Sequence, residues 1–330
     1  MKIRSIATAA AILASTLAAS AQAQSSASLY GLLDLGLVSA KAPGATTATN
    51  KLTSGDMTTS FWGIKAKEDL GGGMSAEAIL EGFIVATSGS AGRFSGDPLF
   101  SRTASVGLNT GAGNLAFGRV TTSLFINTLI FNPLVDAFGY SPAIRQTFIS
   151  GTVSGDTGWN ESVKYSSPNF NGASFTAHQA IKGTSAGDNT GASALYFNGA
   201  FSAGVAYQSV RKYAVTNTDL KQATDTTQVG VAYDLGAAKL FAQYSDVKQP
   251  LLKISYKITG FGVSIPMGTG SIVAHTSQLA PSNAANSTTT TAGYIYPLSK
   301  RTNLYAMIMN ERVPAKSDGN TYGVGLRHGF

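Results

Sequence analysis

Few residues of this chain are placed where they could do covalent chemistry. It has three histidines, His178, His275 and His328, and no cysteine. A histidine could serve as the general base for a serine, or bind a metal together with nearby carboxylates. The three histidines are far apart in the sequence and fall on different predicted strands, and serine and aspartate are too common here for their proximity to indicate a site. The sequence therefore predicts no enzyme, no metal site and no cofactor.

Two glycine clusters are equally uninformative about chemistry. Gly71-Gly72-Gly73 and Gly111-Ala112-Gly113 both lack the parallel strand before and the helix after that a nucleotide-binding loop requires. We interpret both as tight turns.

The composition separates this chain from ordinary cytosolic proteins. Of its 330 residues only 12% are charged, about half the roughly 25% of a typical soluble domain. Glycine reaches 37 residues, and the 16 Phe, 13 Tyr and 2 Trp are spread along the chain, which excludes a disordered or collagen-like polymer. Without cysteine there is no disulfide framework either.

The first residues have the features of an export signal. Lys2 and Arg4 precede an apolar run from Ala7 to Ala19, and Ala21-Gln22-Ala23 fits the small-residue site of signal peptidase. We expect residues 1–23 to be a signal peptide and residues 24–330 to form one domain. An N-terminal membrane anchor is the alternative, but the apolar run is shorter than the roughly 20 residues that a spanning helix needs.

The basic balance of the chain does not indicate nucleic-acid binding. The whole chain carries a formal charge of +7, and removal of Lys2 and Arg4 with the signal leaves +5. The remaining basic residues are dispersed rather than clustered, and the protein is expected to be exported. We therefore expect no nucleic-acid partner.

Beyond residue 24 the dominant pattern is an alternation of apolar and polar residues. No apolar run is long enough for a membrane-spanning helix. In 201–208 and in 228–234 every second residue is Phe, Val, Tyr or Ala, and the residues between are mainly Ser, Gly and Gln. Sixteen such strands are predicted, at 28–38, 59–68, 74–85, 99–109, 113–120, 160–167, 173–181, 192–198, 201–209, 226–234, 238–246, 254–265, 271–279, 288–296, 302–311 and 320–330.

The links between these strands alternate between short and long. The short links are built from the turn formers Gly, Pro, Asn and Asp, and the long ones are rich in Thr, Ser, Asn and Gly. Alternating short and long connections are typical of outer-membrane barrels. The longest links are predicted at 39–58 and 121–159.

A sheet exported into a bilayer has to close, because each unpaired backbone group in hydrocarbon costs several kcal/mol. A barrel of 16 to 18 strands encloses an aqueous channel. We therefore predict an all-β fold, a transmembrane antiparallel β-barrel of sixteen strands. Charges on the lipid face would cost about 2–4 kcal/mol at the midplane, so Glu81 is expected to face the lumen or lie near a rim.

The end of the chain carries a second membrane signal. Five residues share one face of the last predicted strand, and the chain stops at an aromatic residue. We interpret this face as a C-terminal assembly signal, formed by Tyr322, Val324, Leu326, His328 and Phe330.

Over nearly its whole length after the signal, the sequence resembles the general-diffusion porins of Gram-negative bacteria, in the branch typical of β-proteobacteria. The order and spacing of several short blocks carry the resemblance: Leu29-Tyr30-Gly31-Leu32-Leu33-Asp34, Trp62-Gly63-Ile64-Lys65, Glu68-Asp69-Leu70-Gly71-Gly72-Gly73, Leu80-Glu81-Gly82-Phe83, Phe100-Ser101-Arg102, Val106-Gly107-Leu108, Phe117-Gly118-Arg119, Val163-Lys164-Tyr165-Ser166-Ser167-Pro168-Asn169-Phe170, Leu298-Ser299-Lys300-Arg301-Thr302-Asn303-Leu304-Tyr305 and Gly325-Leu326-Arg327-His328-Gly329-Phe330.

The resemblance implies a homotrimer in the outer membrane, in contact with its lipid and lipopolysaccharide. Each barrel would pass small hydrophilic solutes and ions through a pore that the third long loop, here 121–159, narrows by folding inward. In the family this loop brings acidic groups opposite a ladder of basic side chains. The residues that this implies for the constriction are Lys65, Lys67, Glu81, Arg102, Arg119 and Asp136.

The alternation along the strands supports a lumen-facing position for some of these residues more than for others. Lys65 and Lys67 alternate with Trp62 and Ile64, which favours the lumen for the lysines, whereas Arg102 and Arg119 fall in phase with apolar residues and rest on the resemblance. The family often has Arg where this chain has Phe61, so one of the family's basic side chains is missing from this wall. The net charge favours anions weakly.

Two other functions fit the same barrel. A solute-selective channel with a weak lumenal binding site would be favoured by Tyr30 and Phe61 on lumen-facing positions. A surface adhesin or structural barrel would instead bind a partner through its loops and leave the pore occluded.

Overall fold

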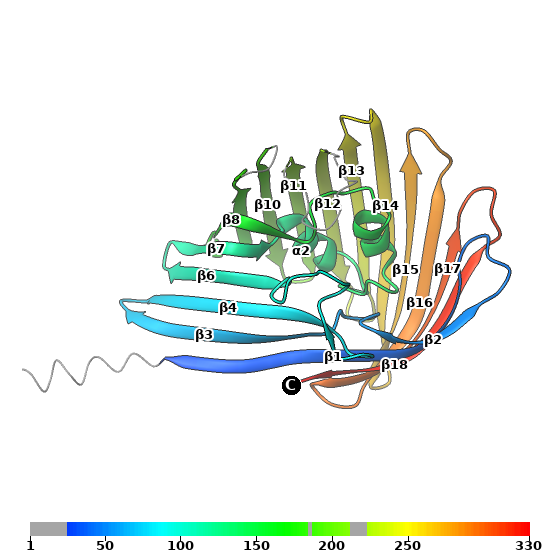
Figure 1. Ribbon diagram of the computed structural model, residues 1–330, viewed down its shortest axis with the longest axis horizontal. Helices are drawn as coiled ribbons and strands as arrows, with labels where there is room; N and C mark the ends of the chain where they lie inside the picture. The colour runs from blue at the N-terminus through cyan, green and yellow to red at the C-terminus, as the bar shows by residue number, and fades with distance from the viewer. Residues whose placement is uncertain (1–24, 184–186, 212–222) are drawn as a thin grey trace, which may run out of the picture.

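In the computed structural model, which describes residues 25–183, 187–211 and 223–330, the chain forms one large antiparallel sheet that closes on itself (Figure 1). The first strand, β1 (Ser26–Lys41), pairs with the last, β18 (Gly319–Gly329), through ten residue pairs from Leu32↔Gly329 to Lys41↔Asn320. The predicted signal peptide, residues 1–23, lies outside the described residues.

The strands between β1 and β18 are β2 (Thr49–Ser54), β3 (Phe61–Gly71), β4 (Met74–Val85), β5 (Ser90–Ala91), β6 (Thr103–Thr110), β7 (Gly113–Thr121), β8 (Gly158–Ser166), β9 (Ala173–Ala180), β10 (Asn189–Asn198), β11 (Phe201–Val210), β12 (Thr224–Asp234), β13 (Lys239–Gln249), β14 (Ile254–Met267), β15 (Gly270–Pro281), β16 (Ser287–Pro297) and β17 (Thr302–Arg312).

Around the circumference the barrel has the sixteen strands that the sequence predicts. β2 and β3 pair with successive parts of β1 and together make one strand position, and β5 pairs only with the end of β4. The fold prediction is confirmed. The interpretation of 39–58 as a link is wrong in part, because β1 continues to Lys41 and β2 occupies Thr49–Ser54.

The break between β2 and β3 has a local cause. The buried carboxylate of Asp34 on β1 accepts hydrogen bonds from the backbone N–H groups of Met57 and Thr58, with N···O distances of 2.6 and 2.9 Å. These two residues therefore bond to a side chain instead of the strand ladder, and the chain between the two strands bends toward β1.

The two faces of the sheet have opposite chemistry. On β12, Val229, Val231 and Tyr233 are exposed on the outer face, whereas Gln228 on the inner face is buried. This is the reverse of a soluble protein and matches a barrel that is apolar outside and polar inside. The period of two in the sequence therefore marks the lipid-facing positions.

The segment between β7 and β8 covers part of the polar inner face. It contains α2 (Ser123–Ile130), α3 (Pro142–Ile144) and the single π-helical turn η1 (Arg145–Ile149), and Figure 1 shows α2 on the concave side of the sheet. Contacts run from α2 to β10, β11 and β12, and from α3 to β14, β15 and β16. Among the described residues, no helix has the length and apolar character needed to cross a membrane.

Glycines let this segment approach the wall closely. A side chain on Gly204 of β11 or Gly230 of β12 would overlap Asn127 or the ring of Phe131. On β14, a side chain on Gly262 would meet Pro133 in the same way. The inner wall is therefore shaped to receive residues 127–133.

Candidate functional site

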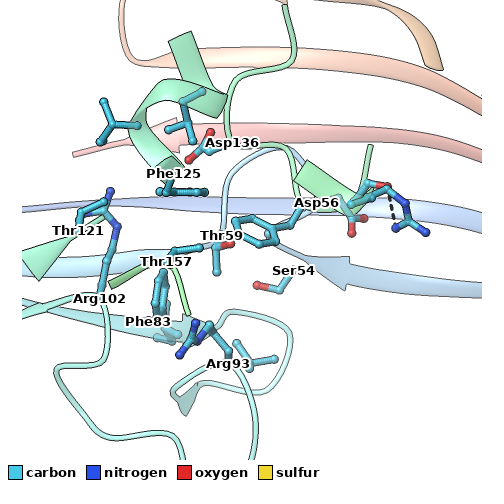
Figure 2. Close-up of a pocket in the computed structure, with 18 residues that line it drawn as sticks. Ser54, Asp56, Thr59, Phe83, Arg93, Arg102, Thr121, Phe125, Asp136 and Thr157 are labelled. Carbon is cyan, nitrogen blue, oxygen red and sulfur yellow. Dashed lines mark hydrogen bonds between the residues drawn. The ribbon is translucent and has the colours of Figure 1, made fainter. Parts of the chain in front are cut away.

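A cavity of about 450 Å³ lies between residues 122–157 and the wall formed by β2, β4 and the chain before β6. Figure 2 shows its labelled side chains, with Phe125 and Asp136 at the top of the view and Phe83 and Arg93 at the bottom. Its polar lining includes Ser54, Asp56, Thr59, Arg93, Arg102, Thr121, Asp136, Arg145 and Thr157. The cavity therefore combines both signs of charge with apolar side chains.

Arg102 lines this cavity and is paired with Glu81 of the barrel wall. Nη1 of Arg102 lies 2.5 Å from Oε2 of Glu81, and the hydroxyl of Tyr30 donates to Oε1 of Glu81 at 2.8 Å. The Arg102 guanidinium also stacks 4.0 Å from the centroid of Phe61. Arg102 reaches the inner side because β6 begins only at Thr103, so the alternation of that strand does not apply to it.

Phe61 and Tyr30 belong to the same group. Their rings meet edge to face with centroids 6.2 Å apart. Phe61, which stands where the family often has a basic residue, thus carries the Arg102 guanidinium on its face. This corresponds to a cation–π contact, worth about 0.5–2 kcal/mol depending on hydration.

The two lysines lie further along β3 toward its short turn. Lys65 is on the polar face and forms an ion pair with Glu77, with 2.6 Å between Nζ and Oε2. Lys67 is exposed and lies two residues nearer the turn. Neither residue lines the cavity. The two lysines share one face of β3, and the structure separates both of them from the cavity.

Arg119 turns inward because of an irregularity in β7. The register against β8 shifts between Gly118 and Val120, and Gly118 has a φ of 122°, a conformation that favours glycine. The guanidinium of Arg119 then donates to Asp156 at 2.6 Å and to the carbonyl oxygens of Ser101 and Gly158. The alternation in the sequence places Arg119 on the outer face with Phe117, but the bulge at Gly118 turns its side chain inward.

Asp156 is shared by a second arginine. Arg93 binds Asp156 with 3.0 Å between Nη1 and Oδ1 and also binds Asp97 through Nε at 2.9 Å. Burial alone would raise the pKa of Asp156, but hydrogen bonds from Arg93 and the charges of both arginines lower it to about 2. The carboxylate is therefore ionised throughout the physiological range.

Asp136 belongs to the segment between β7 and β8 and also lines the cavity. Its Oδ1 accepts a hydrogen bond from the hydroxyl of Thr58 at 3.0 Å, and that hydroxyl is also 2.9 Å from Nη1 of Arg327. Burial raises the pKa of Asp136, which outweighs the hydrogen bond from Thr58 and the attraction of Arg327. Of the six predicted constriction residues, Arg102 and Asp136 line the cavity, and Glu81 contacts Arg102.

Several charged residues of the site carry no signal in the sequence. Arg93, Arg145 and Asp56 also line the cavity, and Arg145 binds Glu311 of β17 at 2.8 Å. They lie in connecting segments, where no period of two exists to assign a face. Only the structure brings them together.

The five residues of the predicted assembly signal lie on one face. Tyr322, Val324, Leu326, His328 and Phe330 are all exposed on the outer side of β18. Phe330 continues the pairing with β1, since its N–H donates to the carbonyl oxygen of Gly31 at 3.0 Å and its own carbonyl accepts from Gly31 at 3.2 Å. The last residue thus extends the seam between the first and last strands.

The histidines are distributed over separate places. His178 stacks on Trp159 and is 2.9 Å from the hydroxyl of Ser162, His275 is buried on β15, and His328 is 2.9 Å from the hydroxyl of Thr302. Within the described ranges, no three His, Asp or Glu side chains form a group that could hold a metal ion.

Comparison with known proteins decides the family. A family model described as Gram-negative porin matches residues 7–316. The chain belongs to this family. It is an outer-membrane porin of a Gram-negative bacterium, and its barrel is a passive diffusion channel.

Individual relatives agree with this assignment. The porin is 32% identical to outer membrane porin protein 32 of Delftia acidovorans, covering 92% of this chain and 88% of the relative. It is 28% identical to an outer membrane porin protein of Bordetella pertussis, covering 97% and 98%. Among solved structures it is similar to an anion-selective porin from Comamonas acidovorans, with a TM-score of 0.78, 24% identity and coverage of 93% and 100%. OmpT of Vibrio cholerae, as a loop-deletion mutant, matches with a TM-score of 0.73 and 16% identity, covering 93% and 99%.

Proposed function

We propose that the passage between residues 122–157 and the wall at Glu81 and Arg102 is the constriction of the pore and sets its selectivity. The 450 Å³ cavity supports this, because residues of the inner segment and of the wall both line it. The segment is also held at the inner face by hydrogen bonds to three different strands, β12, β13 and β15, through Gln228, Gln243 and Ser277. In this proposal the segment is the inward-folded third loop.

The charges favour a weak preference for anions. Arg93, Arg102 and Arg145 line the passage against Asp56 and Asp136. Each arginine is also paired with a carboxylate, which reduces the field available to a permeating ion. The structural relative named as an anion-selective porin supports the same sign. A few such charges bias permeation without blocking it, because unit charges 4 Å apart interact by about 1–4 kcal/mol between water and an effective dielectric of 20.

We propose that the working assembly is a homotrimer embedded in outer-membrane lipid and lipopolysaccharide, with no enzymatic activity. A related porin, OmpT of Vibrio cholerae, is described as having a trimer form. The apolar outer face of β18 and β1 offers a surface for neighbouring protomers or lipid, with Leu29, Leu37 and Val324 exposed there.

Planar-bilayer conductance of the refolded porin tests these points together. Ohmic current in steps of three indicates a trimeric diffusion pore, and the reversal potential in a KCl gradient gives the ion preference. A clear cation preference would contradict the proposed selectivity, and a silent protein would favour the adhesin or structural barrel.

A second function, a solute-selective channel, is favoured by one observation. Tyr30 and Phe61 lie on the inner side next to Arg102, where an aromatic surface and a guanidinium can both contact a solute. Current that one class of solute blocks at low concentration would support this function.

A further inference from the structure

Helix α2 buries its polar residues against the wall and leaves most of its apolar residues partly exposed. Ser123, Asn127 and Thr128 are buried together with one apolar residue, Leu124, whereas Phe125, Ile126 and Leu129 remain partly exposed. An amphipathic helix usually directs its apolar side to a core and its polar side to water. In this porin, the apolar side of α2 lines the cavity of the lumen.

Hydrogen bonds fix this orientation. Nδ2 of Asn127 donates to Oε1 of Gln228 at 2.8 Å, and Nε2 of Gln243 donates to the carbonyl oxygen of Thr128 at 2.8 Å. At the start of the helix, the hydroxyl of Ser123 lies 2.6 Å from that of Thr176. Rotating the apolar side toward the wall would break these bonds and leave buried polar groups without partners, at about 1–3 kcal/mol each.

The apolar side forms a continuous surface with neighbouring aromatic residues. The ring of Phe125 lies 5.9 Å from that of Phe138 and 5.4 Å, edge to face, from that of Phe148. Phe83 lines the cavity from the wall. These side chains expose apolar surface to water. A solute with an apolar body is favoured over water here, because its contact removes apolar surface from water.

Guanidinium groups line the same cavity. Arg102 and Arg145 contribute from the wall and the inner segment, and Arg93 lies 4.9 Å above the ring of Phe83. The lining also holds two carboxylates, Asp136, which accepts from Thr58, and Asp56, which accepts from Thr53. The three arginines of the lining therefore outnumber its carboxylates by one. A planar carboxylate matches the paired N–H donors of a guanidinium. The cavity's volume of about 450 Å³ is within the range of roughly 300–1,000 Å³ for small-molecule sites.

We propose that this cavity is a weak binding site for monocarboxylates with an aromatic or similarly flat apolar body, which the porin passes in preference to hydrophilic anions of the same charge. This rests on the proposed function, since it assigns a solute class to the same passage. The ring packs on Phe125, Ile126 and Leu129, and the carboxylate binds Arg102.

Single-channel recording with benzoate as the probe tests the proposal, with gluconate and benzylammonium as comparisons. Benzoate is expected to interrupt the chloride current at a concentration about fivefold lower than gluconate, the effect of removing part of a ring from water. Benzylammonium shares the ring but carries the opposite charge, and it is expected to act no better than gluconate. Equal potency of benzoate and gluconate, or of benzoate and benzylammonium, would overturn the proposal.

Two variants separate the apolar surface from the charge. The double variant Ile126→Asn, Leu129→Gln makes the exposed side of α2 polar and is expected to abolish the difference between benzoate and gluconate. Arg102→Gln is expected to weaken the block by both carboxylates, benzoate and gluconate, and to leave benzylammonium unchanged. Val135→Asn is the matched control, because Val135 is exposed on the same segment, has a positive φ of 48° that suits asparagine, and does not line the cavity.

The outcomes distinguish this proposal from the more general one. Ohmic KCl current from each variant shows that the barrel is folded and that diffusion through it is intact. With that current present, a benzoate preference that survives in the double variant, or that disappears in Val135→Asn, would refute the role of α2. Absence of KCl current in the unmodified porin would instead count against the proposed constriction, which has to leave the pore open.

Discussion

Arg93 binds Asp156 with 3.0 Å between Nη1 and Oδ1, and so joins two segments that lie 63 residues apart in the chain. Asp156 also accepts from Arg119 on β7 at 2.6 Å. One carboxylate therefore connects the segment after β4, the end of the segment after β7, and the wall. The inner segment is held at this end by charge, whereas its beginning, at Asn127 and Thr128, is held by neutral hydrogen bonds to β12 and β13.

Replacing Asp156 should loosen this end of the inner segment. Asp156→Asn keeps the shape of the side chain but leaves Arg93 and Arg119 without their shared charge, at a cost of about 1–3 kcal/mol. We expect larger fluctuations of the open-channel current. Asp318→Asn is a matched control, because Asp318 pairs with the exposed Arg312 on an outer loop. Current noise that is the same in Asp156→Asn as in the unmodified porin would show that the charge does not hold the segment.

The same contact should depend on pH only in strong acid. The folded-state pKa of Asp156 is about 2, below its ordinary value of 3.8, so its stabilising effect is complete above about pH 4 and is lost as the pH falls through 2. Recording current noise from pH 6 down to pH 2 measures this. An increase that is complete by pH 4 would mean that another carboxylate controls the segment.

Adding one methyl group at Gly230 should displace the inner segment from the wall. A side chain there would overlap the ring of the fully buried Phe131, so Gly230→Ala forces Phe131 and α2 away from β12. Overpacking of this kind costs about 1–3 kcal/mol. We expect a lower unfolding temperature and a changed single-channel conductance. Gly111→Ala, at a turn with open space around it, should change neither quantity.

The fold could be predicted from sequence because its signal repeats. In β12, Val229, Val231 and Tyr233 face outward as their spacing predicts, and β11 and β13 repeat the pattern. The short and long links then imply antiparallel closure. The strand ends are less predictable. The break between β2 and β3, for example, depends on hydrogen bonds from Met57 and Thr58 to Asp34, which is more than 20 residues earlier in the chain.

The site could be predicted only in part, for a physical reason. The phase of β3 places Lys65 on the polar face, but Arg102 precedes its strand and Arg119 follows a bulge, so alternation does not determine where either points. Arg93 and Arg145 lie outside the barrel strands, and their partners Asp156 and Glu311 are 63 and 166 residues away. Contacts between non-periodic segments leave no pattern in a single sequence.

Removing the charge of Glu81 should increase the preference for anions. Glu81 binds both Arg102 and Tyr30, so Glu81→Gln leaves the Arg102 guanidinium without its neighbouring carboxylate at the wall of the passage. We expect the permeability ratio of chloride to potassium to rise about fivefold, within the range that one charge supplies in a partly hydrated pore. Reversal potentials in a KCl gradient measure the ratio. Glu68→Gln removes the same charge near the short turn after β3, where Glu68 is exposed, and is expected to have little effect. An equal shift in both variants would show that net charge, rather than Arg102, governs selectivity.

Shortening the last residue should weaken closure of the barrel. The ring of Phe330 lies against Gly31, so close that a side chain on Gly31 would overlap it, and the two backbones exchange hydrogen bonds at 3.0 and 3.2 Å. Phe330→Ala keeps the backbone bonds but removes the ring that covers the seam between β1 and β18, at about 1–2 kcal/mol for its partly buried area. We expect a smaller fraction of refolded protein, measured by heat-dependent mobility in gels. Tyr322→Ala is the control, since Tyr322 is an aromatic residue on the same exposed face at the other end of β18. If Tyr322→Ala lowers the folded fraction as much as Phe330→Ala does, the aromatic face as a whole, and not the ring at the seam, assists assembly.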